Sequence, residues 1–211
     1  MGTSDREWLE KVYNAESNAE LSEGYDEWAA DYEGDVRGFG YLIPAVAAGL
    51  FCRHVGPGEP GGPVLDAGAG TGMMGEILAL LGYGDLTGID LSEGMLERAR
   101  EKSAYRSLRK MALGETLDFP DDAFAAGIST GVFTAGHAPA RSLDELVRLT
   151  RPGGHLVFSV KSDVYEEGFR EKQETLESEG RWRLVEATGE FRYVPLGEPE
   201  SVGRVFVYQV Q

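Results

Sequence analysis

The fold of this 211-residue chain is decided by the stretch Val64-Leu65-Asp66-Ala67-Gly68-Ala69-Gly70-Thr71-Gly72. Its first four residues have the character of a short buried strand, and every second residue of the following loop is glycine. An apolar helical pattern continues from about Gly72 to Leu81. Glycines let the backbone approach a ligand closely, and a helix N-terminus offers free N–H donors. We therefore expect a ligand site directly after this strand.

Strands and helices alternate on the C-terminal side of this stretch. Further strands are predicted at 86–90, 109–113, 127–133 and 155–161, with helices between them at 92–102, 142–151 and 163–179. Ser92 is the expected N-cap of one helix, and Ser142-Leu143-Asp144-Glu145 is the expected capping box of another. Two longer strands, 181–194 and 203–211, close the chain as a hairpin. The pattern predicts an α/β, Rossmann-like, seven-stranded and mostly parallel sheet with one antiparallel strand and helices on both faces.

The N-terminal quarter of the chain reads as a separate helical segment. Charged and aromatic residues recur at roughly helical spacing from Asp5 to Glu33, and a second helix is expected from Pro44 to His54. The glycine- and proline-rich run 56–63 is unsuited to the interior of a helix or strand. We expect one domain overall, with an N-terminal helical lid at 1–56 and a ligand-binding core at 57–211.

The charge and cysteine content of the chain limit the kinds of partner and compartment that we expect. The chain has 20 Lys and Arg against 36 Asp and Glu, a formal net charge of −16, which disfavours nucleic acid and anionic membrane surfaces. The single cysteine, Cys52, excludes an intramolecular disulfide and favours a reducing compartment. Met1–Glu10 lacks the apolar core of a signal peptide. We predict a cytoplasmic protein without nucleic-acid or membrane partners, and both a monomer and a homodimer stay open.

Two ligand classes suit the glycine loop. The spacing Gly70-Thr71-Gly72-Met73-Met74-Gly75, with Asp90 20 residues after Gly70, satisfies a dinucleotide fingerprint and allows a nicotinamide-dependent dehydrogenase. However, Asp66 and Glu76 flank the loop without a nearby lysine or arginine. A phosphate-free ligand with a cationic centre therefore fits better. S-adenosylmethionine has an ammonium and a sulfonium, and Asp90 can accept hydrogen bonds from both of its ribose hydroxyls.

Three ordered motifs carry a resemblance to a known family. The stretch 64–72 resembles the first motif of class I S-adenosylmethionine-dependent methyltransferases, and Gly88-Ile89-Asp90-Leu91-Ser92-Glu93-Gly94-Met95-Leu96 resembles their second. Arg151-Pro152-Gly153-Gly154-His155-Leu156 matches the turn before their fifth strand. More narrowly, Tyr25-Asp26-Glu27-Trp28-Ala29 through Asp35-Val36 is similar to the methyltransferase-like proteins named after the Williams–Beuren syndrome region and to their bacterial relatives.

The resemblance implies roles for particular residues. The implied cofactor-binding residues are Tyr25, Trp28, Tyr32, Asp66, Ala67, Gly68, Gly70, Asp90, Leu91, Met95, Leu113, Gly114, Glu115, Thr130 and Gly131. The three aromatic residues would close over the methionine end, although core packing is an alternative role for them. The wider family often has an Asp where Leu113 stands, so the resemblance implies that adenine recognition relies on backbone groups.

Histidine is the residue type to search for a catalytic base, because a neutral acceptor must lose its proton. His137 follows the fourth predicted strand and is the candidate general base; a loop histidine bonded to backbone is the alternative. No metal site is legible, and none is predicted. The predicted function is methyl transfer from S-adenosylmethionine to the O or N of a small molecule. The alternatives are a cofactor-binding regulator without turnover and a nicotinamide-dependent dehydrogenase.

Overall fold

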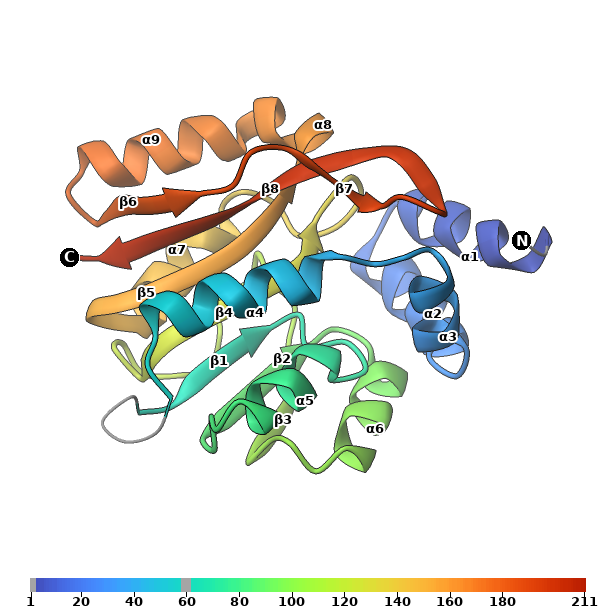
Figure 1. The fold of residues 1–211 in the computed structure, drawn as a ribbon, viewed down its shortest axis with the longest axis horizontal. Helices are drawn as coiled ribbons and strands as arrows, with labels where there is room; N and C mark the ends of the chain where they lie inside the picture. Colours follow the sequence, from blue (N-terminus) through green and yellow to red (C-terminus); the bar gives the residue numbers. More distant parts are fainter. Residues whose placement is uncertain (1–2, 58–61) are drawn as a thin grey trace.

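A sheet of eight strands forms the centre of the part that the computed structural model describes, residues 3–57 and 62–211. The strands lie in the order β3-β2-β1-β4-β5-β8-β6, and β7 also pairs with β8. Figure 1 shows helices on both faces of this sheet. The strands are β1 Val64–Ala67, β2 Leu86–Asp90, β3 Ser107–Lys110, β4 Phe124–Phe133, β5 Thr150–Lys161, β6 Trp182–Ala187, β7 Phe191–Val194 and β8 Glu198–Val210.

The pairing directions confirm the predicted fold class. Strands β1 to β5 pair with one another in parallel. Strand β8 is antiparallel to each of its neighbours β5, β6 and β7. The molecule therefore has the mostly parallel sheet with one antiparallel strand that alternating strands and helices predict.

The predicted number of seven strands is wrong by one, because the stretch expected as a single strand at 181–194 forms β6 and β7. Between these two strands the Thr188 hydroxyl accepts a hydrogen bond from the Val205 N–H at 3.0 Å. A side chain thus takes the place of a backbone acceptor, and the ladder is interrupted. Strand β8 also begins at Glu198, earlier than the expected 203.

The N-terminal helices divide into two groups. They are α1 Thr3–Tyr13, α2 Asn18–Trp28, α3 Tyr32–Gly38 and α4 Ile43–His54. Helices α1 to α3 enclose an apolar cluster of their own around Trp28 and Phe39, and they lie beyond the ends of the central strands (Figure 1). Helix α4 instead packs on the sheet, where Ala47 and Phe51 are fully buried. The segment predicted as a lid thus includes one helix that covers the sheet.

Two of the remaining helices test the predicted caps. The remaining helices are α5 Met73–Leu80, α6 Glu93–Glu101, α7 Ser142–Leu149, α8 Ser162–Val164, η1 Tyr165–Phe169 and α9 Arg170–Ser178. The Ser92 hydroxyl accepts from the Met95 N–H at 3.1 Å, so the expected N-cap of α6 is confirmed. The capping box at Ser142 is wrong: Ser142 N–H already donates to Pro139 O, and Glu145 binds Leu117 N–H instead. The helix begins one residue too early for Ser142 to cap it.

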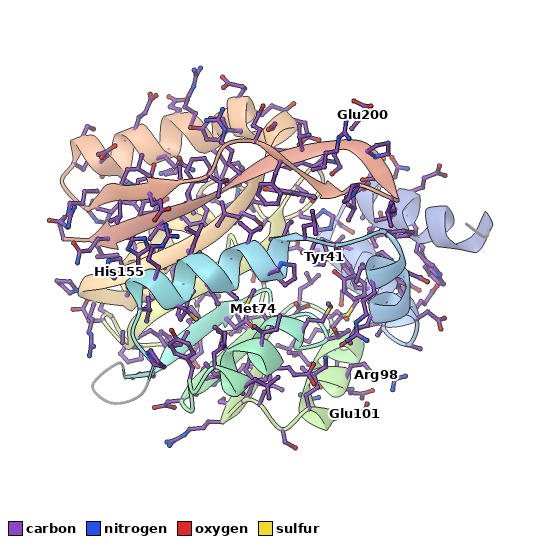
Figure 2. The ribbon with its side chains drawn as sticks, in the orientation of Figure 1. Tyr41, Met74, Arg98, Glu101, His155 and Glu200 are labelled. Atoms are coloured by element: carbon purple, nitrogen blue, oxygen red, sulfur yellow. The ribbon has the colours of Figure 1, made fainter. Side chains whose placement is uncertain are left out.

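Side chains fill the space between the sheet and its helices, as Figure 2 shows. Charged residues such as Arg98 and Glu101 lie on the outer side of α6. Within the described residues no single helix is long and apolar enough to cross a membrane, and only α3 with α4, bent by 90°, passes that test as a pair. The prediction that 56–63 holds no helix or strand falls partly on 58–61, outside the described residues.

Candidate functional site

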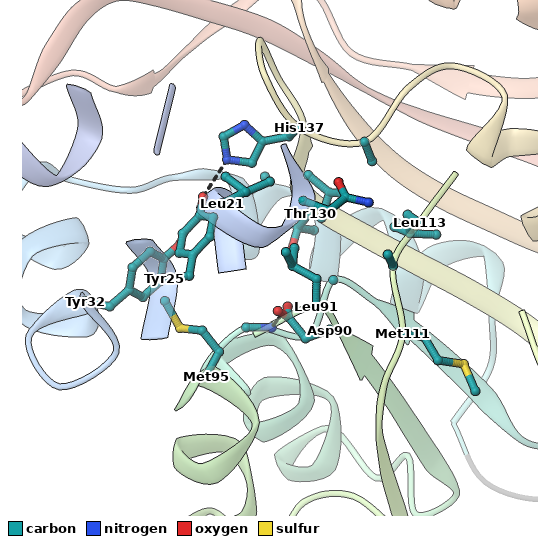
Figure 3. Close-up of a pocket in the computed structure, with 17 residues that line it drawn as sticks. Leu21, Tyr25, Tyr32, Asp90, Leu91, Met95, Met111, Leu113, Thr130 and His137 are labelled. Carbon is teal, nitrogen blue, oxygen red and sulfur yellow. Dashed lines mark hydrogen bonds between the residues drawn. The ribbon is translucent and has the colours of Figure 1, made fainter. Parts of the chain in front are cut away.

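A pocket lies where β1, β2 and β4 end, beneath helix α2 (Figure 3), with about 690 Å³ of space that is partly open to solvent. Residues from distant parts of the sequence line it together. The predicted site residues among them are Tyr25, Tyr32, Gly68, Gly70, Asp90, Leu91, Met95, Leu113, Thr130, Gly131 and His137. The carboxyl end of a parallel sheet is where such folds bind ligands. The structure therefore gathers most of the predicted site at that edge.

Some predicted residues lie outside the pocket wall. They are Trp28, Asp66, Ala67, Gly114 and Glu115. Trp28 is buried and donates from Nε1 to the Asp35 carboxylate at 2.7 Å. Ala67 is buried within β1, and Glu115 borders a separate open hollow. A cofactor-binding role for these residues stays a prediction.

The pocket also contains residues that the sequence analysis missed. They are Asn18, Leu21, Met111, Ala112, Val132 and Ala138. Leu21 precedes Tyr25 by one helical turn, so the same face of α2 carries both. Met111 and Ala112 directly precede Leu113. Helical spacing and the position after the third strand were therefore available signals for three of these residues.

The glycine loop needs its glycines for conformation and for space. Gly68 has φ +83 and Gly70 has φ +53, values that favour glycine. A Cβ on Gly68 would collide with the side chain of Val132. No atom lies within 4 Å of a Cβ built on Gly70, so the space above that residue is open to a ligand.

The amides of this loop are already used inside the protein. The N–H groups of Gly68 and Ala69 donate to Ile89 O at 2.8 and 2.9 Å. In the first turn of α5, the Gly75 N–H donates to the Tyr105 hydroxyl at 3.1 Å. A pyrophosphate at a helix N-terminus requires such amides to be free. These internal hydrogen bonds leave fewer loop amides free for a pyrophosphate than the glycine spacing alone suggests.

Asp90 is the acidic residue of the pocket wall, and that wall includes no lysine or arginine. Its Oδ2 accepts from the Gly70 N–H at 2.8 Å, and its Oδ1 accepts from the Ser92 N–H at 2.9 Å. Burial raises the pKa of the Asp90 carboxyl, and these backbone hydrogen bonds oppose that rise. Each carboxylate oxygen keeps a further lone pair. Asp90 is thus held in place with acceptor capacity left for two ligand hydroxyls.

Asp66 lies deeper, in β1 under the loop. The Tyr105 hydroxyl donates to its Oδ2 at 2.5 Å, while its Oδ1 is buried without a partner among the described residues. Burial raises the pKa of Asp66 to about 7. An unpartnered buried acceptor is unusual in a folded protein. It fits a ligand that brings a hydrogen-bond donor, such as an ammonium, to the loop above.

The wall opposite the glycine loop carries a hydrogen-bonded pair. The Tyr25 hydroxyl lies 2.7 Å from His137 Nε2 (Figure 3), and His137 Nδ1 lies 2.7 Å from Ala135 O. A carbonyl oxygen only accepts, so Nδ1 carries the proton of the neutral ring and Nε2 accepts from Tyr25. Burial lowers the pKa of His137. His137 is therefore a neutral base at neutral pH, held in one tautomer.

A second cavity, with about 570 Å³ of space that is partly open to solvent, adjoins the first. Tyr25, Tyr32 and Gly131 line both. Its other walls include the aromatic residues Tyr13, Trp28, Phe39, Tyr41 and Tyr193, with Lys161 and Glu198 among the polar residues. Gly131 has φ +72, and a Cβ there would collide with the Tyr41 hydroxyl. The two cavities thus meet at a position that only glycine accommodates.

Helix α2 is fastened to the loop that follows β2. Asp26 Oδ1 accepts from the Ser92 hydroxyl at 2.6 Å and from the Gly94 N–H at 2.8 Å. One helical turn earlier, the Ser22 hydroxyl donates to Leu91 O at 3.0 Å. These contacts hold Tyr25 over the pocket and hold the loop that carries Leu91 beneath it.

The other two histidines lie away from the pocket wall. His54 Nε2 is 2.7 Å from the Glu186 carboxylate, and its ring is 5.9 Å from that of His155. A search of the described residues finds no group of three or more His, Cys, Asp or Glu side chains arranged to hold a metal ion.

Known proteins resemble this chain in sequence and in fold. A family model described as a methyltransferase domain matches residues 65–158, which span the glycine loop, Asp90 and His137. Residues 65–158 therefore resemble a methyltransferase domain, and the fold is the one that class I S-adenosylmethionine-dependent methyltransferases have.

Individual relatives agree with that class. Human methyltransferase-like protein 27 is 33% identical over 164 residues, covering 75% of this chain and 66% of the human protein. Phosphatidylethanolamine N-methyltransferase of Cereibacter sphaeroides is 38% identical over 104 residues, 46% of this chain and 49% of that protein. The match therefore spans under two thirds of the human relative and about half of the bacterial one.

Solved structures share the fold at lower identity. A putative methyltransferase of Haloferax volcanii, in complex with the Trm112 methyltransferase activator, has a TM-score of 0.63 at 21% identity and covers 88% of this chain and 97% of its own. The [4+2]-cyclase SpnF has a TM-score of 0.61 at 18% identity, covering 79% and 81%. A protein named as a cyclase thus has the same architecture, and the fold alone does not decide the reaction.

Proposed function

We propose that this protein transfers a methyl group from S-adenosylmethionine to the O or N of a small-molecule acceptor in the cytoplasm. The observation that carries the proposal is the pair of adjoining cavities. The first contains the carboxylate of Asp90, the second includes several aromatic side chains among its walls, and the two meet at Tyr25, Tyr32 and Gly131. When bound, the cofactor supplies a methyl group activated by a sulfonium.

The residues of the first cavity would hold the cofactor. Asp90 would accept from the two ribose hydroxyls, since each of its oxygens has one backbone N–H partner, Gly70 or Ser92, and keeps a further lone pair. Leu91 and Met95 offer apolar surface for the adenine. Tyr25 and Tyr32 would cover the methionine end. This set suits a ligand without phosphate, because a phosphate beside Asp90 would meet a like charge.

The second cavity would hold the acceptor. Its aromatic walls exclude water and restrict the orientation of a bound molecule. Alignment of this kind supplies about 7–11 kcal/mol of barrier lowering in well-oriented reactions. The names of similar proteins include N-methyltransferases and O-methyltransferases, so the proposal covers both acceptor atoms.

Calorimetric titration with S-adenosylhomocysteine tests the cofactor assignment. We expect Asp90→Ala to weaken binding roughly 10- to 100-fold, because a hydrogen bond to a charged group contributes about 1.5–3 kcal/mol. Asp85→Ala is the matched control, since Asp85 pairs with Arg106 on the surface. Equal affinity of the wild type and Asp90→Ala would defeat the ribose assignment, and tighter binding of NADH would favour a dehydrogenase.

A second candidate is a cofactor-binding protein that does not turn over. It is a candidate because the fold alone does not decide the reaction: SpnF has the same architecture and is named as a cyclase. The two candidates differ in whether the chain releases S-adenosylhomocysteine from S-adenosylmethionine in the presence of small acceptors. Tight binding with no release from any acceptor would support this second candidate.

A further inference from the structure

Tyr25, unlike His137, lies where the two cavities meet. Tyr25 lines both cavities, whereas His137 lines only the first. The hydroxyl of Tyr25 already occupies His137 Nε2, at 2.7 Å. A direct removal of the acceptor's proton by His137 would require that hydrogen bond to break.

The direction of this hydrogen bond determines what Tyr25 can do. His137 Nδ1 is directed at Ala135 O, with the Thr134 hydroxyl also 3.1 Å away. The proton of the neutral ring is therefore on Nδ1, and the Tyr25 hydroxyl proton points to Nε2. The lone pairs of the Tyr25 oxygen remain available to a donor bound beside Tyr25, where the two cavities meet.

We propose that Tyr25 is the catalytic residue that accepts the proton of the methyl acceptor while it passes its own hydroxyl proton to His137. This inference rests on the proposed function and deepens it, since it names the class of acceptor. The class comprises phenols, alcohols and amines, which carry a proton that must leave. Carboxylate acceptors are already ionised and do not need Tyr25 and His137 to remove a proton.

The step balances in atoms and electrons. The acceptor's O–H or N–H proton moves to the Tyr25 oxygen, and the Tyr25 hydroxyl proton moves to His137 Nε2, which leaves a protonated imidazole. The acceptor's electron pair forms the new bond to the methyl carbon as the sulfur–methyl bond breaks, and that bond's electrons remain on sulfur as a neutral thioether. The imidazole then releases its extra proton to solvent.

The electrostatic surroundings favour a concerted transfer. Burial raises the pKa of the Tyr25 hydroxyl well above its ordinary value, so a free tyrosinate is costly. Burial also lowers the pKa of His137, and the positive charge of Lys161 on β5 lowers it further. The other titratable group against the His137 ring is Tyr13 of α1, 5.8 Å away. No carboxylate is among the groups that shift the pKa of His137.

The test uses Tyr25→Phe and His137→Gln in the full chain, with Tyr165→Phe as the matched control. Tyr165 stacks on Phe206 and lines neither cavity. Release of S-adenosylhomocysteine is measured with a panel of small phenols, alcohols, primary amines and carboxylates. Binding of S-adenosylhomocysteine is measured in parallel for every variant, so that loss of the cofactor site is recognised separately.

We expect the wild type to methylate phenols or amines, and both variants to lose roughly 100-fold in kcat with unchanged KM and unchanged cofactor affinity. Glutamine can accept the Tyr25 hydrogen bond but no proton, so a purely structural His137 would be rescued by it. The wild-type kcat should fall at acid pH with an apparent pKa below 6.5, and this limb should vanish in both variants.

Three results would overturn the inference. They are full kcat in either Tyr25→Phe or His137→Gln, activity confined to carboxylates, and cofactor binding without methylation of any phenol, alcohol or amine. Failure of the wild type to bind S-adenosylhomocysteine would instead remove the proposed function on which the inference rests.

Discussion

Two carboxylates near the glycine loop differ in their partners. Asp90 accepts two backbone N–H bonds, whereas Asp66 has one partner, Tyr105, and one unpartnered oxygen. Hydrogen bonds from N–H groups stabilise the ionised form and burial destabilises it. Asp66, fully buried, therefore carries the larger energetic penalty when it ionises.

This difference predicts how stability depends on pH. The pKa of Asp66 is about 7 in the folded chain against 3.8 for an ordinary carboxyl. The folded state therefore binds the proton more tightly, and the stability contributed by protonated Asp66 is lost as pH rises from about 4 through 7. The loss is on the order of 4 kcal/mol. Urea unfolding at several pH values should show this fall in the wild type and a smaller one in Asp66→Asn; parallel curves would contradict it.

Gly131 gives a second prediction at the residue scale. Gly131→Ala should destabilise the fold by about 1–2 kcal/mol for its left-handed backbone, and further through collision with Tyr41. Gly153→Ala is the matched control, because Gly153 has φ +82 with nothing within 4 Å of a Cβ. Thermal unfolding and S-adenosylhomocysteine titration check both variants. Equal losses in the two would show that the space at Gly131 is unimportant.

At the scale of elements, α2 is the helix that completes the pocket. Asp26 is the residue that fastens it to the start of α6, through Ser92 and Gly94. We expect Asp26→Ala to loosen α2 and to raise the dissociation rate of S-adenosylhomocysteine roughly tenfold, since two hydrogen bonds to a charged group are lost. Stopped-flow displacement measures the rate. Glu23→Ala, at an exposed position on the same helix, should leave it unchanged; a normal rate in Asp26→Ala would refute the role of this contact.

Features set by neighbouring residues were predictable from the sequence. The strand 64–67, the glycine loop and the Ser92 cap depend on local conformation, and each lies where the sequence places it. The break between β6 and β7 was not predictable, because it depends on pairing of Thr188 with Val205 across the hairpin. The predicted capping box at Ser142 is wrong for a similar reason: the carboxylate of Glu145 accepts a hydrogen bond from the distant Leu117 N–H instead.

The same distinction holds within the candidate site. Asp90 was predicted because it ends a strand 20 residues after Gly70, and His137 because it follows the fourth predicted strand. The contact between Tyr25 and His137 joins residues 112 positions apart, and only the docking of α2 over the sheet edge creates it. Lining residues such as Asn18 and Ala138 have no sequence signal of their own, because their position in the pocket follows from that docking.

At the scale of the whole molecule, the candidate site lies at one edge of the sheet. The carboxyl ends of β1, β2 and β4 carry the pocket, and helices α1 to α3 cover that edge (Figure 1). The apolar cluster of α1 to α3 is separate from the two clusters that flank the sheet. The aromatic second cavity lies among these helices and the adjoining strands, which is where an acceptor would be enclosed.

The measurement that tests the account most directly is a crystal structure of the chain with S-adenosylhomocysteine bound. The account predicts both ribose hydroxyls within hydrogen-bond distance of the Asp90 carboxylate, and the sulfur beside Gly131 at the junction of the two cavities. A nucleoside seated elsewhere, or a ribose that makes no contact with Asp90, would contradict it.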